Sequence, residues 1–263
     1  MGSHLIIDAG RCIGCGQCVQ VCIRDNLSVE DGIAVETGGP CFDCGQCEAV
    51  CPEDAIRLTR YRGMEPTEYD QSEPVVGYDE MVDFLNRRRS CRLFVGERVE
   101  DDQISRLFES VRNSPTAMNS QGVEYVLLSD RMPEFLRHIA AILRTESGRF
   151  PRIEQFCSMD DPGRLGRHPL IWDGRQAVLA FSEIPADAVV ATARLEMTAY
   201  TMGLGGFYSR WIQMADEVDH EAVMRFFPDV PVKKRLNCVF VFGHPKTRYR
   251  RTVPRDDPKV HRY

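Results

Sequence analysis

Two matched runs of cysteines constrain the fold of this chain more than any other feature of its sequence. The first run reads CIGCGQCVQVC from Cys12 and the second reads CFDCGQCEAVC from Cys41, so each cysteine recurs 29 residues later. Gly16, Gln17 and Val21 recur at the same interval. A repeat of this kind indicates a small cysteine-bound unit that is used twice.

The number and spacing of the cysteines favour metal binding over disulfide formation. The chain has eleven cysteines, an odd number, and eight of them fall in the two runs. No secretory leader is evident that would direct them to an oxidising compartment. The spacing C-x2-C-x2-C-x3-C is typical of 4Fe–4S ligands, and the fourth cysteine of each run then binds the other cluster. The predicted ligands are Cys12, Cys15, Cys18 and Cys51 for the first cluster and Cys22, Cys41, Cys44 and Cys47 for the second.

The remainder of this segment predicts a small β/α unit. Zinc is the alternative metal, because cysteine pairs of this spacing also bind zinc. We expect strands at 5–7, 27–29, 33–35 and 55–58, a hairpin turn at Asp31-Gly32, and a helix that starts at the fourth cysteine of each run. Residues 5–60 resemble the bacterial dicluster ferredoxins, except that Ile23 stands where that family commonly has proline.

The charge distribution excludes some classes of function. The net charge is −6, and residues 1–60 hold −5 of it, with four Arg against nine Asp and Glu. A nucleic-acid binder would present a basic face instead, so we expect no nucleic-acid partner. An acidic lobe suits the docking of a redox partner. No apolar run approaches the roughly 20 residues that span a bilayer, so we expect no membrane span and, with eight reduced thiolates, a cytoplasmic protein.

Hydrophobic periodicity predicts a second, larger domain. We expect a ferredoxin domain over 1–60, a linker over 61–77 and an α+β domain over 78–263. The periodicity predicts helices and strands as follows: helices at 78–89, 102–113, 133–143, 186–202 and 219–227, and strands at 123–128, 177–181 and 237–242. The fold class is therefore α+β, and residues 144–176 match no clear pattern.

Two polar motifs stand out in the second domain. The first motif is Arg87-Arg88-Arg89-Ser90-Cys91-Arg92. It is either the basic end of a helix, which complements the helix dipole, or an anion clamp of guanidinium groups and a hydroxyl. The second motif follows about 25 residues later and reads Ser114-Pro115-Thr116-Ala117-Met118-Asn119. Considered without the first motif, it is a capped turn. No hydrolytic or nucleotide-binding motif accompanies them.

Taken together, the two motifs resemble the nitroreductase family of FMN enzymes. The helix that begins at Asp187 and the arginine-rich tail after Gly243 extend the resemblance over most of 78–255. It implies FMN bound at a homodimer interface, with each site drawing on both chains. The implied FMN phosphate and ribityl ligands are Arg88, Arg89, Ser90 and Arg92, and one of Arg250, Arg251 and Arg248 would complete the clamp. The implied flavin neighbours are Asn119, Ser114, Pro115, Thr116, Ala117 and Met118, together with Phe207, Tyr208, Ser209 and Arg210.

The sequence thus predicts an iron–sulfur flavoprotein oxidoreductase. Electrons would pass from a ferredoxin-type donor through two 4Fe–4S clusters to FMN, and then to a nitro compound, a quinone or an activated alkene. The alternatives are an NAD(P)H-dependent nitroreductase and an electron-transfer or flavin-handling protein without a substrate. No side chain is expected to act as a catalytic acid or base. We expect Cys238 to be inert core. His168 is the one histidine in a region that could contact the acceptor, and the alternative is that it is a surface residue. Residues 144–176 either set the acceptor or form a solvated loop.

Overall fold

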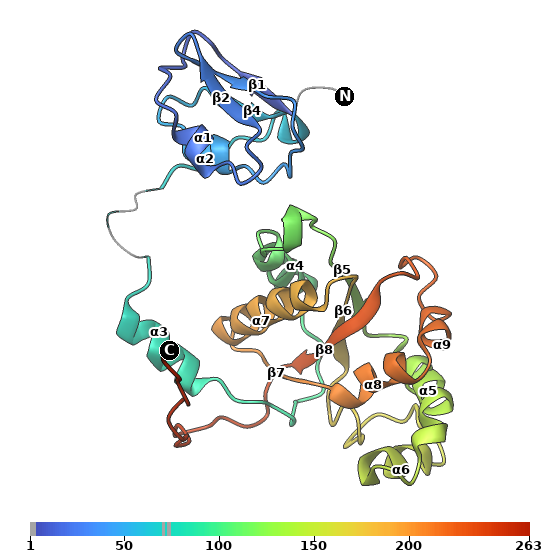
Figure 1. Cartoon of the computed structure of the whole chain (residues 1–263). Coiled ribbons are helices and arrows are strands. Elements are labelled where there is room, and N and C mark those ends of the chain that lie inside the picture. The colour runs from blue at the N-terminus through green and yellow to red at the C-terminus, as the bar shows by residue number, and fades with distance from the viewer. Residues whose placement is uncertain (1–3, 70–71, 73–74) are drawn as a thin grey trace. The chain divides into compact units, whose positions relative to one another are not determined.

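The computed structural model describes residues 4–69, 72 and 75–263 (Figure 1). The chain forms two compact units. The first unit comprises residues up to Val75 together with Ala117–Ser120, and the second comprises Val76–Thr116 and Gln121–Tyr263. The division after Val75 falls within the linker expected over 61–77, of which residues 70, 71, 73 and 74 lie outside the described residues.

The first unit is built from two antiparallel strand pairs and two short helices. Strand β1 (Leu5–Ile7) pairs with β4 (Ile56–Leu58), and β2 (Leu27–Glu30) pairs with β3 (Ile33–Glu36) around the predicted turn. The helices, α1 (Gln17–Val21) and α2 (Gln46–Ala49), occupy equivalent places in the two cysteine runs. A short 3₁₀ turn, η1 (Thr59–Tyr61), follows β4.

The helices of the first unit correct one expectation. Each helix precedes the fourth cysteine of its run instead of starting there, and α1 ends at the residue before Cys22. The repeated glycines explain this placement. Gly16 and Gly45 are the N-caps of α1 and α2, with left-handed φ angles of 73° and 75°, a conformation that glycine adopts without the cost of a Cβ clash.

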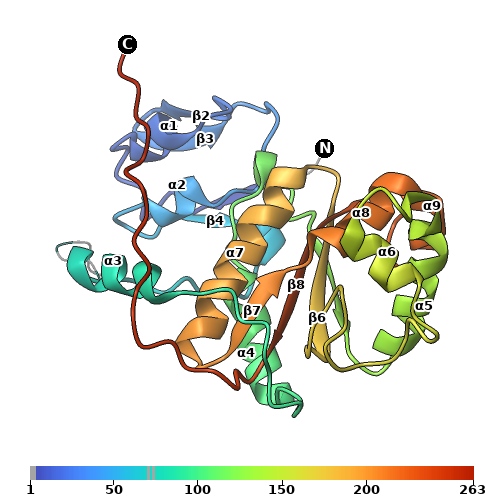
Figure 2. The same ribbon diagram turned by 90° about the horizontal axis from the view of Figure 1, so that it is seen from below.

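The second unit is a four-stranded antiparallel sheet with helices on both faces. The strand order is β5 (Glu124–Leu128), β6 (Gln176–Ser182), β8 (Arg235–Gly243) and β7 (Gly205–Tyr208). Figure 2 shows α7 on one face, and helices α5, α6, α8 and α9 on the other. The remaining bounds are α3 (Tyr78–Arg87), α4 (Asp101–Val111), η2 (Ala117–Asn119), α5 (Met132–Leu143), η3 (Arg144–Glu146), α6 (Pro151–Cys157), α7 (Pro185–Thr201), α8 (Arg210–Val218) and α9 (His220–Met224).

Alternating residues of the central strands fill two separate cores. In β8, Phe240 and Phe242 pack with α4 and α7, and their rings stack with centroids 5.9 Å apart. Val239 and Val241 point to the opposite face and join the larger core beneath α5 and α8. Because successive side chains point to opposite faces, the apolar run of β8 contributes to both cores, as a sheet between two helical layers requires.

The expected α+β class is confirmed, and, apart from short 3₁₀ turns, three elements of the described residues were not expected from the sequence. These are α6, α8 and β7, of which α6 lies in the region without a clear pattern. Strand β7 was missed because its two glycines disfavour a strand. The structure explains one of them, since a Cβ at Gly206 would lie 2.3 Å from the Phe240 ring. Among the residues that the structure describes, no helix is long and apolar enough to cross a membrane.

Candidate functional site

The eight clustered cysteines of the first unit surround two separate cavities. One cavity is lined by Cys12, Cys15, Cys18 and Cys51. The other is lined by Cys22, Cys41, Cys44 and Cys47. Each cavity thus combines three cysteines of one run with the fourth cysteine of the other run, which is the grouping that the sequence predicts for the two clusters.

Backbone N–H groups point at the cysteine sulfurs of both cavities. In the first cavity, Ala34 N donates to Cys12 Sγ at 3.4 Å and Ala55 N donates to Cys51 Sγ at 3.2 Å. In the second, Asn26 N donates to Cys22 Sγ and Asp43 N donates to Cys41 Sγ, both at 3.4 Å. Such donors compensate negative charge on cluster sulfur, so the residues present fit a pair of iron–sulfur clusters.

Three of these cysteines would be protonated thiols without a bound metal. Burial raises the pKa of Cys47 to about 12, and burial also raises the pKa values of Cys18 and Cys41. A buried thiolate without a counter-ion is unfavourable, whereas a bound metal holds the ligand deprotonated. The cysteine pockets are therefore suited to metal rather than to free nucleophilic thiols.

In the second unit, the arginine motif forms an extended segment beside β7. Ser90 makes a parallel bridge with Gly206, and Cys91 N donates to Gly206 O at 2.9 Å. Successive side chains of an extended segment point to opposite sides. The motif therefore presents two different rows of side chains, one with Arg88, Ser90 and Arg92 and the other with Arg89 and Cys91.

The row of Arg88, Ser90 and Arg92 carries fixed cationic groups. Arg88 Nη1 lies 3.0 Å from Glu196 Oε1, and the Glu196 side chain is only 9% exposed. The guanidinium of Arg92 lies 5.4 Å from the centroid of the Phe207 ring. Because a guanidinium has five N–H donors, Arg88 retains donors for an anion while Glu196 fixes its position.

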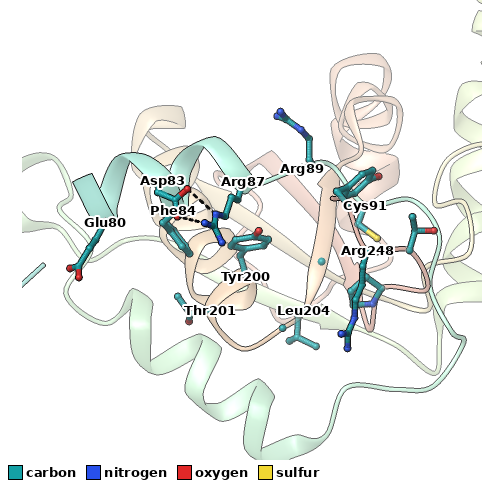
Figure 3. A pocket seen from close by; sticks show the side chains of 15 residues that line it. Glu80, Asp83, Phe84, Arg87, Arg89, Cys91, Tyr200, Thr201, Leu204 and Arg248 are labelled. Atoms are coloured by element: carbon teal, nitrogen blue, oxygen red, sulfur yellow. Dashed lines mark hydrogen bonds and ion pairs between the residues drawn. The ribbon is translucent and has the colours of Figure 1, made fainter. Parts of the chain in front are cut away.

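The other row lines a cavity of about 650 Å³ (Figure 3). Arg89 and Cys91 contribute from the motif, and Arg248 contributes from the tail. On α3, Arg87 pairs with Asp83 at 2.7 Å, as the dashed lines in Figure 3 show. Phe84 and Tyr200 form an aromatic wall, with ring centroids 5.3 Å apart. The cavity is large enough for a cofactor or a small aromatic ligand.

The second predicted motif is divided between the two units. Thr116 Oγ1 accepts a hydrogen bond from Gln121 N at 2.9 Å, and Pro115 is exposed. Ser114 Oγ is buried and has no hydrogen-bond partner among the described residues. A buried hydroxyl of this kind needs a partner, which is a water molecule or a polar ligand. Ala117, Met118 and Asn119 belong to the first unit.

The remaining predicted residues occupy varied environments. Phe207 is buried beneath Arg92, and Tyr208 OH donates to Thr192 O at 3.4 Å. Ser209 is buried, and its hydroxyl donates to Leu170 O at 2.8 Å, which is a structural contact. Arg210 Nη2 lies 2.7 Å from Glu217 Oε2 on the surface, and Arg250 and Arg251 are exposed in the tail. Burial raises the pKa of Tyr208, as does the nearby Glu196.

Sequence reasoning missed Glu196 and the cavity residues of α3 and α7. One signal could have identified Glu196. Thr192, Glu196 and Tyr200 are spaced by four residues and share one face of α7, where Thr192 and Glu196 are buried. A buried carboxylate needs a cationic partner. The leftover Cys238 is buried as expected, and burial raises its pKa to about 11.

His168 is not a surface residue. Its side chain is fully buried, its Nε2 lies 2.9 Å from Pro162 O, and its Nδ1 accepts from Leu170 N at 3.1 Å. It therefore organises the loop within 144–176 in the neutral form, with the proton on Nε2. Burial lowers its pKa to about 4.

This histidine should make the second unit sensitive to acid. Because the folded pKa lies below the unfolded value of about 6.5, the unfolded state binds more protons and stability falls as the pH drops from about 6.5 towards 4. Between pH 7.5 and pH 5 the expected loss is about 2 kcal/mol. Denaturant unfolding followed by Trp172 and Trp211 fluorescence should show a shallower pH dependence for His168→Gln. Equal slopes in the two proteins would contradict this role.

Comparison with known proteins identifies relatives of both units. A family described as "4Fe-4S dicluster domain" matches residues 4–52, and one described as "Nitroreductase family" matches residues 85–244. Ferredoxin-2 of Desulfomicrobium norvegicum is 46% identical over 35 residues, which are 13% of this chain and 59% of that ferredoxin. The match thus spans less than two thirds of the curated relative.

Solved structures share the fold of the second unit. A nitroreductase with bound FMN from Bacteroides fragilis has a TM-score of 0.56 at 13% identity, over 70% of this chain and 99% of its own. A nitroreductase with bound FMN from Desulfitobacterium hafniense has a TM-score of 0.55 at 17% identity, over 68% and 96%. At these identities the likeness establishes the fold alone.

Proposed function

This chain belongs to the nitroreductase family and carries a 4Fe-4S dicluster domain, and we propose that it is an FMN-dependent oxidoreductase supplied with electrons through its own clusters. A ferredoxin-type donor reduces the two clusters, the electrons reach FMN, and an organic acceptor receives them. The observation that carries this proposal is the presence of two cysteine-lined cavities on the same chain as the nitroreductase fold. When bound, FMN converts single electrons into pairs, a conversion that a donor of hydride would make unnecessary.

The row of Arg88, Ser90 and Arg92 is the proposed FMN phosphate and ribityl site. Guanidinium groups bind phosphate in a fixed, bidentate geometry, and the ion pair with Glu196 holds Arg88 in place. Ser114, with its unpartnered buried hydroxyl, is proposed to face the same cofactor. The cavity lined by Arg89 and Arg248 lies on the other side of the segment and is proposed to take the remaining polar contacts of the site or the acceptor.

The acceptor class remains that expected from the chemistry: a nitro compound, a quinone or an activated alkene. Residues 144–176 are proposed to select it. Within this region, the guanidinium of Arg152 lies 4.9 Å from the centroid of the Trp172 ring, and Trp172 has a left-handed φ of 54°. A cation fixed against an aromatic ring suits a planar, electron-poor or anionic acceptor.

The proposed assembly is a homodimer in a reducing cytoplasm. Tyr78, Met81 and Leu85 of α3 are 81%, 42% and 46% exposed, and apolar side chains of this size support burial by a second copy of the chain. The acidic first unit, with −5 of the net charge of −6 in residues 1–60, supports docking of a redox partner with a basic face.

Anaerobic stopped-flow spectroscopy tests the electron donor. Mixing the oxidised holoprotein with a reduced ferredoxin should bleach the cluster absorbance first and the flavin absorbance afterwards, with both phases complete before an added acceptor is reduced. Rapid flavin bleaching by NADPH, with the clusters still oxidised, would instead establish the NAD(P)H-dependent alternative. Full reduction of both groups with no turnover of a nitroaromatic or a quinone would favour an electron-transfer protein without a substrate.

A further inference from the structure

One short turn of the first unit comes from a distant part of the chain. Residues Ala117–Ser120 belong to the first unit, 42 residues beyond the end of its main segment at Val75. In this turn, Met118 and Asn119 have left-handed φ angles of 55° and 51°. This conformation is costly for methionine, whereas asparagine adopts it more readily. Strain of this kind persists only where other contacts hold it.

Asn119 ties the turn to the second cysteine run. Its Nδ2 donates to Phe42 O at 3.1 Å and to Asp43 O at 2.9 Å. Two carbonyl acceptors require the NH2 group of the amide, because the amide oxygen would face them with lone pairs. Both amide hydrogens of Asn119 are therefore committed to the loop between Cys41 and Cys44, and only its Oδ1 remains for another partner.

One of these bonds continues through the backbone to a cysteine sulfur. Phe42 O and Asp43 N belong to the same peptide group, and Asp43 N donates to Cys41 Sγ at 3.4 Å. A donor on the carbonyl side polarises a peptide and strengthens the hydrogen bond that its N–H makes. Asn119 thus acts on Cys41 at a distance of one peptide group.

The first cysteine run has a different arrangement at the equivalent loop. Ile13 and Gly14 stand 29 residues before Phe42 and Asp43. A Cβ on Gly14 would lie 2.3 Å from Gly32 O, so the turn between β2 and β3 covers this loop. Cys12 Sγ accepts from Ala34 N of β3. The two halves of the repeat therefore differ at this point, and only the second loop is held by Asn119.

We propose that Asn119 is a positioning residue of the second cluster, which polarises the peptide that donates to Cys41 and so raises the reduction potential of that cluster above that of the first. A stronger N–H···S bond favours the more negatively charged, reduced form. The inference rests on the cluster content of the proposed function, and it deepens that function by making the second cluster the favoured resting place of an electron.

Redox titration of the whole holoprotein, monitored by electron paramagnetic resonance, tests the proposal. Asn119→Ala removes both donors, and Asn119→Asp removes them with little change of volume. Ser120→Ala is the matched control, because Ser120 is exposed on the same turn. Arg24→Gln assigns the second cluster independently, since Arg24 lines its cavity and lies 4.9 Å from the centroid of the Phe42 ring.

The expected result is a selective shift. The transition that moves most in Arg24→Gln should move to a more negative potential in both Asn119 variants, while the other transition stays in place and Ser120→Ala matches the parent protein. No shift, or an equal shift of both transitions, would overturn the proposal. The potentials are measured without an acceptor, so a failure of the proposed oxidoreductase function would leave this result intact.

Discussion

Replacing Cys22 by alanine is expected to remove the second cluster and to leave the first, although Cys22 belongs to the first cysteine run. The reason is geometric, since Cys22 lines the same cavity as Cys41, Cys44 and Cys47. Iron and acid-labile sulfide should fall from about eight atoms each per chain to about four. The corresponding change at Cys51 should remove the first cluster instead.

Double variants separate this grouping from one in which each run binds its own cluster. Cys15 and Cys44 are equivalent, exposed members of the two runs, so they form a matched pair. Cys22→Ala with Cys44→Ala should lose no more iron than Cys22→Ala alone, whereas Cys22→Ala with Cys15→Ala should lose both clusters. The opposite pattern would show that the cavities group the ligands wrongly. Cys238→Ser, far from either run in the sequence, serves as the control for a general loss of folding.

The cysteines that line each cavity agree with the sequence pattern, because the repeated spacing indicates that the fourth cysteine of each run joins the other run. The repeat also hides an asymmetry. Asp43 and Gly14 occupy equivalent positions, yet one loop is held by Asn119 and the other is covered by the turn at Gly32. No periodicity within residues 1–60 could indicate a partner located 76 residues after Asp43.

In the second unit, sequence patterns predicted the helices and strands better than they predicted the environments of single side chains. The amphipathic helix at α4 and the apolar strand β8 follow from spacing alone. The burial of His168 does not, because it depends on a loop that places Pro162 O and Leu170 N around the imidazole. Likewise, the pairing of Arg88 with Glu196 joins side chains 108 residues apart, and only the folded chain brings them together.

Alanine at Arg92 is expected to weaken FMN binding about 10- to 100-fold, the loss that corresponds to one charge-assisted hydrogen bond of about 1.5–3 kcal/mol. Arg92 is the cleaner test of the proposed phosphate site than Arg88. Removal of Arg88 would leave the buried carboxylate of Glu196 unpaired and would destabilise the fold as well, whereas Arg92 is exposed and contacts the face of Phe207.

Riboflavin, which lacks the phosphate, provides the discriminating ligand. Flavin fluorescence titration of the apoprotein should show that Arg92→Ala weakens FMN binding and leaves riboflavin binding within about threefold of the parent. Arg89→Ala and Arg248→Ala test the rival assignment, because these cations line the cavity and not the proposed phosphate site. If those two variants lose FMN affinity while Arg92→Ala retains it, the phosphate lies in the cavity. FMN would then face the side of the extended segment that carries Arg89, which would contradict the proposed site.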